Sequence, residues 1–476
     1  MRTRMHAGVP GILGALLALG LVVGAGRTAG GAVSEADRLW VVGVQAFEDG
    51  LYDLTYRELG RFVEMVPAAD PRRGDAIFLR GKAAFALGRY TEALRDFQGA
   101  QTVPLQVIAA GEPLFWEAEA LFRLRRFEDA RDRYSLFLRN HPGAPYAADA
   151  LYARAFSELE LGHPDEALAS FNQLLTEFPK SELAASAAYA AARELVRAKR
   201  WEDALPLLST YQNRYVLSRF LPEVRYLLGV TQLETGRTPE GVRTLEQFLA
   251  ANPSQELAPS ARIVLGETHA KAGRGREAIE QYRALVKQAP THPFVPQALY
   301  QIGELSQRLG RAADAESAWK TLRRDHPGDA LAALAGLELA QGYLKRRQFD
   351  QAMDVAREVA DSGGAQRFQA LLLLGESALK AGKLGDAETA YARALAEAPP
   401  DSPERLRALA GVGLVAESQR EAGAARRAYQ EIIDKAEDAE LVQWAKGRVQ
   451  GLEAREKPPP RPAPKGKPRS KLEGKS

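Results

Sequence analysis

Side chains that could carry out bond chemistry are few and scattered. The chain has six histidines and no cysteine, so Cys-ligated metals, thiol nucleophiles and disulfides are absent. His141, His163, His292 and His326 each directly precede a proline, which is typical of turns. No histidine pair has the spacing of a helical zinc motif, and the sequence has neither a phosphate-binding loop nor a G-x-S-x-G nucleophile motif. The sequence therefore predicts no enzyme, no catalytic residue, no cofactor and no metal site.

Recognition chemistry is better represented, because aromatic residues recur at a fixed interval of 37 residues. The series, which we call the aromatic ladder, comprises Phe78, Phe115, Tyr152, Tyr189, Tyr226 and, two intervals later, Tyr300. Aromatic rings are rigid and amphipathic, and they anchor partner chains well. The ladder has two interpretations. Its rings could line a binding groove, or each ring could pack against the neighbouring repeat.

Basic residues form a second series, which we call the basic row. It comprises Lys271, Arg308, Lys345 and Lys380. Three of them follow a glutamate by four residues, in Glu267/Lys271, Glu304/Arg308 and Glu376/Lys380, and Glu119/Arg123 has the same spacing. Acid-first pairs at this spacing stabilise a helix by roughly 0.2–0.5 kcal/mol each. The row is either a solvated helix face or a line of positive charge that selects acidic ligands.

Both series need repeated structural elements to position them, and one 18-residue sequence motif, which we call the phrase, recurs along the chain. The phrase reads GHPDEALASFNQLLTEFP at 162–179, GRGREAIEQYRALVKQAP at 273–290 and GRAADAESAWKTLRRDHP at 310–327. Each copy begins with Gly, has Ala at its sixth place and an aromatic residue at its tenth, and ends in Pro. Twelve residues before that Ala stands another small residue.

Alignment on these two small residues gives eleven copies. The first small residue is Gly43, Gly81, Ala118, Ala155, Ala192, Gly229, Gly266, Gly303, Ala340, Gly375 and Ala416. In the last copy the second small residue is Ala428 and the large residue four places later is Ile432. Each copy has two segments with helical apolar spacing, and in most copies Gly separates them and Pro closes the unit. The sequence therefore predicts an all-α solenoid of about 11 helix-turn-helix repeats over residues 33–453, with a period of about 37.

This pattern resembles the tetratricopeptide repeat family, which uses small residues on both helices, an aromatic residue and a terminal Pro at a period of 34. Gly266, Ala278, Tyr282 and Pro290 match it well. The resemblance implies a right-handed superhelix whose first helices line a concave groove, with the aromatic ladder on the groove side. Runs such as FPKSELAASAAYAAA (178–192) are similar in style to bacterial envelope members of the family, of the outer-membrane assembly and tol-pal accessory types.

Two interruptions of the repeat are candidate joints. Val216 replaces the expected Pro within NRYVLSRFLPE (213–223), and Gly363-Gly364 replaces it after the ninth copy. Each is a candidate flexible joint, and whether the array bends there stays open at this point. We expect the last copy to cap the array.

The two ends of the chain differ from the body. Arg2 and Arg4 precede the uncharged run VPGILGALLALGLVVGAG (9–26), and small residues typical of a cleavage site follow it. This pattern predicts a cleaved signal peptide over residues 1–32. An uncleaved membrane anchor is the alternative. Residues 454–476 are predicted to be a disordered Pro/Lys-rich tail, since residues 457–476 carry seven Lys or Arg residues and one acid. The tail could aid solubility, contact anionic lipid or cell-wall polymer, or bind nucleic acid.

The sequence therefore predicts an exported, periplasmic or secreted scaffold that binds other envelope proteins through its groove. Nucleic acid and small-molecule substrates are not expected partners. The alternative function is a peptidoglycan- or carbohydrate-binding module that stacks sugars on the aromatic ladder and holds acidic polymer with its tail. An enzyme with an unrecognised site is the third hypothesis.

Overall fold

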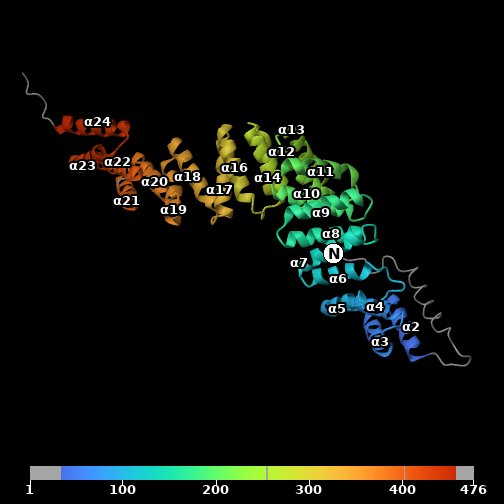
Figure 1. The fold of residues 1–476 in the computed structure, drawn as a ribbon. Coiled ribbons are helices and arrows are strands. Elements are labelled where there is room, and N and C mark those ends of the chain that lie inside the picture. The colour runs from blue at the N-terminus through green and yellow to red at the C-terminus, as the bar shows by residue number, and fades with distance from the viewer. Residues whose placement is uncertain (1–33, 253–255, 401, 457–476) are drawn as a thin grey trace, which may run out of the picture. The chain divides into compact units, whose positions relative to one another are not determined.

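The computed structural model describes residues 34–252, 256–400 and 402–456, and every regular element in these ranges is an α-helix. The 23 helices, α2 to α24, form eleven successive hairpins followed by one further helix (Figure 1). The prediction of an all-α repeat solenoid is confirmed. The chain divides into two compact units, residues 1–253 and 254–476. The division lies at neither of the two interruptions that the sequence suggested as joints.

The first unit contains six hairpins. Their helices are α2 (Glu35–Glu48), α3 (Tyr52–Met65), α4 (Arg73–Ala86), α5 (Tyr90–Ala100), α6 (Glu112–Arg123), α7 (Phe127–Asn140), α8 (Ala147–Glu160), α9 (Pro164–Glu177), α10 (Ala184–Arg197), α11 (Trp201–Arg214), α12 (Leu221–Glu234) and α13 (Thr238–Ala251). Each of these helices packs on the next, and one continuous apolar core runs from Leu39 to Leu228.

The second unit contains five hairpins and the terminal helix. Its helices are α14 (Ala258–Lys271), α15 (Gly275–Gln288), α16 (Val295–Arg308), α17 (Ala312–Asp325), α18 (Ala330–Lys345), α19 (Phe349–Ser362), α20 (Arg367–Lys380), α21 (Leu384–Glu397), α22 (Pro403–Ser418), α23 (Ala422–Lys435) and α24 (Ala439–Glu456). First helices of successive hairpins also touch, in the pairs α16 with α18, α18 with α20 and α20 with α22. This stacking buries the face that a single hairpin would leave bare.

Every hairpin turns at one residue with positive φ, seven places after its first small residue. These residues are Gly50, Gly88, Arg125, Gly162, Lys199, Gly236, Gly273, Gly310, Arg347, Gly382 and Arg420. The next residue donates its N–H to the carbonyl five places earlier, as Leu51 does to Ala46 at 2.8 Å. This is a Schellman motif, which satisfies carbonyls that the helix end would otherwise leave unpaired.

The last hairpin corrects the sequence alignment by three residues. The alignment placed its small and large residues at Ala416, Ala428 and Ile432. The turn at Arg420 and the approach of Gly413 to the Tyr429 ring show that Gly413, Ala425 and Tyr429 hold these places. The error arose because residues three apart lie on the same face of a helix, so similar residue types occur one turn later. In addition, the turn residue is Arg420, whereas most other copies have Gly at this place.

Small residues let the two helices of a hairpin approach closely, as predicted. A Cβ atom added to Gly375 would lie 2.7 Å from Cζ of Tyr391, and one added to Gly43 would lie 2.6 Å from Cδ2 of Leu59. Gly266 has the same relation to Tyr282. Real Cβ atoms need more room, so a large side chain on the second helix rests directly on the backbone of the first.

Pro follows the second helices as the pattern predicts, since seven of them end two residues before a Pro of the sequence. Examples are α7, which ends at Asn140 before Pro142, and α15, which ends at Gln288 before Pro290. Where Pro is missing, other devices end the helix. Gly363, with φ 78°, follows α19. After α11, the Tyr211 hydroxyl and Ser218 Oγ form a hydrogen bond of 2.7 Å.

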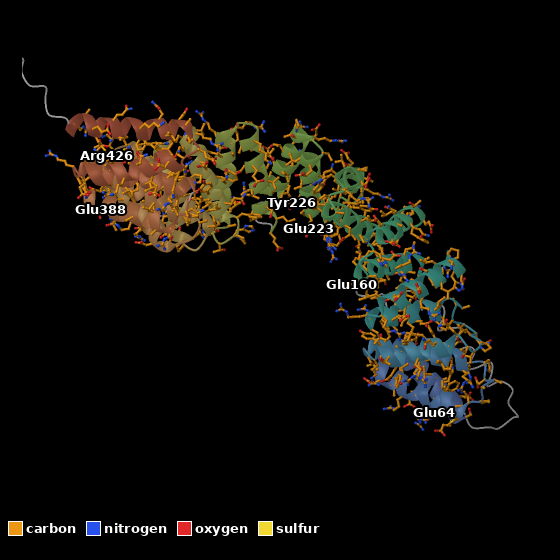
Figure 2. All side chains as sticks on the ribbon, turned by 60° about the vertical axis from the view of Figure 1, so that its left-hand side comes forward. Glu64, Glu160, Glu223, Tyr226, Glu388 and Arg426 are labelled. Carbon is orange, nitrogen blue, oxygen red and sulfur yellow. The ribbon has the colours of Figure 1, made fainter. Side chains whose placement is uncertain are left out.

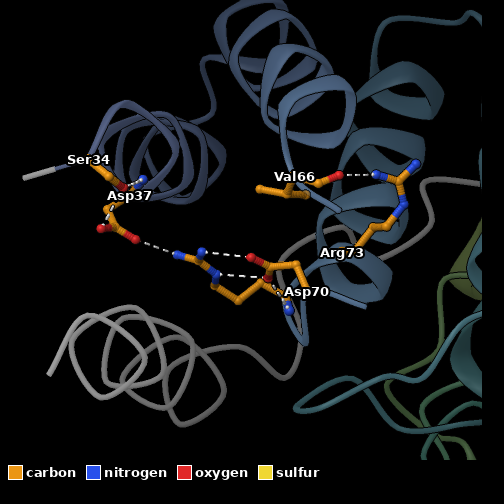
Figure 3. A network of polar contacts seen from close by, with 6 residues as sticks. Ser34, Asp37, Val66, Asp70 and Arg73 are labelled. Carbon is orange, nitrogen blue, oxygen red and sulfur yellow. Dashed lines mark hydrogen bonds and ion pairs between the residues drawn. The ribbon is translucent and has the colours of Figure 1, made fainter. Parts of the chain in front are cut away.

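A buried arginine fastens the first hairpin to the second (Figure 3). Arg72, whose side chain is 5% exposed, pairs with Asp37 and with Asp70 at 2.9 Å each. The hydrogen bond from Ser34 and the Arg72 charge lower the pKa of Asp37. Nearby, Arg73 donates to the carbonyl of Val66 at 3.0 Å. These contacts hold α2 against the loop that leads into α4.

The two predicted terminal segments lie largely outside the described residues. The signal peptide expected over 1–32 is not described, and neither are residues 457–476 of the expected tail. Helix α24 continues to Glu456, past residue 453 where the sequence places the end of the solenoid. None of the helices in the described ranges is long and apolar enough to cross a membrane.

The close approach within a hairpin makes a testable prediction. Gly375→Ala should destabilise the second unit, because the buried Tyr391 ring occupies the space that the new methyl group needs. Overpacking typically costs about 1–3 kcal/mol, more than the roughly 0.8–1.0 kcal/mol that Ala gains over Gly in a helix. Gly447→Ala on α24 is the matched control, since a methyl group added there has no heavy atom within 4 Å, and it should stabilise. Urea unfolding followed by circular dichroism measures both changes.

At a turn with positive φ, the opposite effect is expected: replacing a non-glycine residue by Gly should raise the free energy of unfolding. Lys199 holds a φ of 56°, and a left-handed conformation costs an L-residue roughly 1–2 kcal/mol. Lys199→Gly should therefore stabilise the first unit by about 0.5–1 kcal/mol after the larger entropy of unfolded Gly is subtracted. Gly162→Lys at the equivalent turn should destabilise by a similar amount. Equal unfolding midpoints for Lys199→Gly and the parent chain would contradict the strain argument.

Candidate protein-binding surface

The aromatic ladder divides into buried and half-buried rings. Phe78 on α4 is 1% exposed and Phe115 on α6 is fully buried. Phe78 packs on Phe97 at 5.7 Å between ring centroids, and Phe115 stacks on Tyr146 at 4.6 Å. Both rings therefore follow the packing interpretation of the ladder. They offer no surface to a ligand, and we leave them out of the candidate site.

The four tyrosines of the ladder are half-buried. Tyr152 on α8 packs on Phe171 at 5.9 Å, and Tyr226 on α12 packs on Phe248 at 6.1 Å. Tyr189 on α10 and Tyr300 on α16 have the same intermediate exposure. Each of these rings contributes to packing and still reaches the surface, so the binding interpretation of the ladder stays open for them.

A layered stack stands at the centre of the α10–α12 surface. The rings of Tyr189 and Phe220 lie parallel, with centroids 4.4 Å apart and an interplanar angle of 6°. The Arg219 guanidinium lies 4.6 Å from the Phe220 centroid, and the Arg193 guanidinium lies 5.7 Å from that of Tyr189. Cations over aromatic faces are attracted by the ring quadrupole. The stack thus holds two exposed guanidinium groups beside an aromatic pair.

Polar partners fix the tyrosine hydroxyls of this surface. Burial raises the pKa of Tyr152, while a hydrogen bond with Ser186 and the nearby charges of Arg193 and Arg219 act in the opposite direction. Burial also raises the pKa of Tyr189, and a hydrogen bond to Glu223 adds to the shift. Both phenols therefore stay protonated at neutral pH and can donate hydrogen bonds.

We define the aromatic–arginine face as Tyr152, Tyr189, Arg193, Arg219 and Tyr226, which come from α8, α10, α12 and the loop before α12. Figure 2 labels Tyr226 and its neighbour Glu223 on α12. The face combines apolar rings, hydroxyl donors and positive charge. This is the composition typical of protein-binding surfaces, which are enriched in Tyr and Arg.

The basic row lies in the second unit, and all four of its residues are exposed. Two of the predicted pairs form, Arg308 with Glu304 at 3.5 Å and Lys380 with Glu376 at 2.8 Å. Within the described residues, neither Lys271 nor Lys345 has an ion pair at 4.0 Å or less. The helix-face interpretation holds for the paired residues, and the ligand-selecting interpretation stays open for the other two.

Acidic side chains interrupt the row of positive charge. Burial, followed by the charges of Glu304 and Glu338, raises the pKa of Tyr300. Burial and the charge of Glu304 also raise the pKa of Glu338. Glu267 accepts a hydrogen bond of 2.8 Å from Gln297. The second unit therefore presents mixed charge around Tyr300. On the aromatic–arginine face, Arg193 is paired with Glu194 at 3.6 Å, whereas Arg219 has no ion pair at 4.0 Å or less within the described residues.

Sequence reasoning missed Arg219, Phe220 and Glu223 as members of the site. All three lie in or beside the segment 213–223, which the sequence marked only as an interruption of the repeat. The distances that join them to Tyr189 run between successive hairpins. No spacing rule within one hairpin could have found them.

In the described part of the chain, no three histidine or carboxylate side chains gather as a metal site requires. His141 and His326 cap α7 and α17 at inter-hairpin turns, as expected. His269 differs, since it is buried on α14 and its Nδ1 accepts a hydrogen bond of 3.0 Å from Arg274.

Comparisons with known proteins agree with this architecture. A sequence profile of the tetratricopeptide repeat family matches residues 57–113, 115–182, 152–216, 226–293, 337–403 and 372–440. A second profile of the same repeat matches residues 297–329. The comparison with curated protein sequences gave no match.

The comparison with solved structures gave matches at low sequence identity. One is the C-terminal part of a TPR protein from Cytophaga hutchinsonii, at 14% identity over 54% of this chain and 98% of that one, with a TM-score of 0.43. The pilF protein of Pseudomonas aeruginosa has 18% identity over 47% and 94%, with a TM-score of 0.34. PilW, a type IV pilus biogenesis factor, has 18% identity over 47% and 97%, with a TM-score of 0.34.

The profile matches extend over more than half of the chain. They coincide with helix hairpins whose small residues, aromatic residues and closing prolines occupy the places that the repeat requires. The chain belongs to the tetratricopeptide repeat family.

Proposed function

We propose that this protein is an exported scaffold that holds a protein of the bacterial cell envelope on its aromatic–arginine face. The observation that carries the proposal is the stack of Tyr189 and Phe220 between Arg193 and Arg219. It supplies large apolar contact area at low conformational cost, together with charge-assisted donors. A partner segment with acidic and apolar side chains fits this chemistry.

The geometry favours a protein ligand over a sugar. A sugar ring stacks on an open aromatic face, but Phe220 covers one face of Tyr189 and the Arg193 guanidinium lies near its ring. Tyr152 is likewise packed against Phe156, with centroids 4.9 Å apart. The rings are therefore better placed to contact a chain through their edges and hydroxyls than to receive a flat sugar.

Export and envelope location rest on the sequence of the N-terminus. Arg2 and Arg4, the apolar run 9–26 and the small residues that follow have the composition of a signal peptide. The basic C-terminal residues supply positive charge for contact with anionic lipid or cell-wall polymer. Cell fractionation and N-terminal sequencing of the mature chain test the location independently of partner binding.

The binding proposal predicts the effect of a variant that keeps the packing of the face. Tyr152→Phe, Tyr189→Phe, Tyr226→Phe and Arg193→Ala together remove three hydroxyls and one guanidinium but leave the rings in place. Hydrogen bonds to charged groups contribute about 1.5–3 kcal/mol each, so capture of the partner from envelope extract should weaken at least about tenfold. Quantitative pull-down with mass spectrometry measures this, and circular dichroism checks the fold.

The matched control is Lys271→Ala with Lys345→Ala, which removes two exposed charges from the basic row. Capture should persist in this variant. Loss of capture in the control, with no loss in the face variant, would move the binding site to the second unit and contradict the proposal.

A further inference from the structure

The loop between α11 and α12 exposes two adjacent apolar side chains. Val216 is 58% exposed and Leu217 is 97% exposed. We call this pair the Val216–Leu217 knob. A leucine at this exposure contributes almost nothing to the core, so folding does not explain its presence.

Equivalent loops of the other hairpins lack such a pair. Examples of the residues at the same two places are Pro142-Gly143, Pro179-Lys180, Pro290-Thr291 and Pro327-Gly328. These residues end the preceding helix and leave a turn without a large apolar side chain. The knob is therefore a specific departure of one hairpin from the repeat.

Hydrogen bonds fix the loop that carries the knob. Ser218 Oγ bonds the Tyr211 hydroxyl at 2.7 Å and accepts the N–H of Phe220 at 3.2 Å. On the other side, Arg214 donates to the carbonyl of Pro179 at 2.8 Å. A preordered loop loses little conformational entropy when its apolar side chains are buried by a partner.

Positive charge flanks the knob on both sides. Arg214 lies over the Tyr215 ring at 5.5 Å, and Arg219 lies over Phe220 at 4.6 Å. Both arginines are exposed, and neither has an ion pair at 4.0 Å or less within the described residues. The knob would fit an apolar hollow with an acidic rim.

The second unit contains such a hollow between α21, α22 and α23, with a volume of about 430 Å³. Ala392, Leu395, Val412 and Val415 form its apolar lining, and Glu388 and Glu421 stand at its edge. Figure 2 labels Glu388. We call this hollow the α21–α23 pocket. Cavities of about 150 Å³ already bind benzene, so the pocket has room for a leucine and a valine side chain.

Two alanines open this pocket. Ala392 and Ala396 stand five and nine residues after the small residue of α21, where α15 has Arg283 and Lys287. The equivalent hollow beside α15 has about 280 Å³ and these two basic residues in its lining. Among the eleven second helices in the described ranges, only α21 has alanine at both places. The pocket is thus also a departure from the repeat.

Its charge is complementary to that of the knob. Glu388 accepts a hydrogen bond of 3.0 Å from Gln419, which leaves its charge uncompensated. Glu421 has no ion pair at 4.0 Å or less within the described residues. The basic residue in the lining, Arg405, is paired with Glu431 at 3.3 Å. Two carboxylates therefore face outward without a neutralising partner.

We propose that the Val216–Leu217 knob of one molecule inserts into the α21–α23 pocket of a second copy of the chain, with Arg214 and Arg219 facing Glu388 and Glu421. The two patches are different, so the contact is heterologous and repeats from copy to copy. It generates open chains or closed rings in place of a two-fold dimer. A contact of this size is weak, so assembly depends on concentration and, through its charges, on salt.

Sedimentation velocity of the full chain over a concentration series tests the proposal. The parent chain should form species larger than a monomer, and high salt should reduce them. Leu217→Lys, which copies Lys180 of the neighbouring loop, should remain monomeric at every concentration. Ala392→Arg with Ala396→Lys, which copies residue types from α15, should also remain monomeric. Thr321→Lys, at the hollow beside α15, is the matched control and should assemble like the parent.

Mixing the two monomeric variants provides the decisive measurement. The Leu217→Lys chain keeps a pocket, and the Ala392→Arg/Ala396→Lys chain keeps a knob, so an equimolar mixture should form 1:1 dimers and nothing larger. Should the doubly substituted chain fail to fold by circular dichroism, Glu388→Lys with Glu421→Lys takes its place.

Three results would overturn the proposal. They are a parent chain that stays monomeric throughout the series, assembly that persists in Leu217→Lys, and a mixture of variants without dimers. None of these results depends on the partner of the aromatic–arginine face. Failure of self-association would therefore leave the proposed function untouched.

Discussion

The close contact between a small residue on one helix and a large side chain on the next fixes the geometry of most hairpins, the exception being the hairpin of α18 and α19, where Ala356 takes the place of the large residue. In the hairpin of α20 and α21, the Tyr391 ring rests on the backbone at Gly375, where even a methyl group lacks space. Such a contact tolerates no shift of one helix along the other. It therefore sets which residues of the first helix point inward, toward the next hairpin or toward solvent. The 37-residue interval of the aromatic ladder is a consequence of this fixed register.

The same register position nevertheless serves different purposes in different hairpins. Phe115 is fully buried because Tyr146, at the start of the next first helix, stacks on it. In the following hairpin the residue equivalent to Tyr146 is Leu183, which has no ring to stack on Tyr152, and Tyr152 stays half-exposed. Phe220 returns an aromatic residue to that place beside Tyr189. The surroundings of each ladder residue thus depend on the side chains of the next hairpin, although Tyr189 keeps its intermediate exposure under its stacked ring.

This dependence explains how much the sequence could predict. The period, the paired helices, the closing prolines and the all-α architecture follow from patterns within single copies, and they agree with the structure. The register of the last hairpin could not be predicted from the sequence, because Ala416 and Ile432 are similar in type to Gly413 and Tyr429 and lie one helical turn later. The burial of Phe115 and the Arg219–Phe220–Tyr189 stack did not follow either, since contacts between hairpins decide them. The spacing of one copy contains no information about which side chains the next copy brings.

In a repeat array, equivalent positions of the copies can be compared with one another to see which residue types the fold requires. Each place occurs eleven times, so a residue type that suits the fold is seen in several copies, as Pro is after most second helices. Val216 and Leu217 depart from their equivalents without adding to the core, and Ala392 and Ala396 depart from theirs by leaving space unfilled. Neither departure adds a side chain to the core of its hairpin. Their complementary shape and charge are better explained by contact with another surface than by the needs of the solenoid.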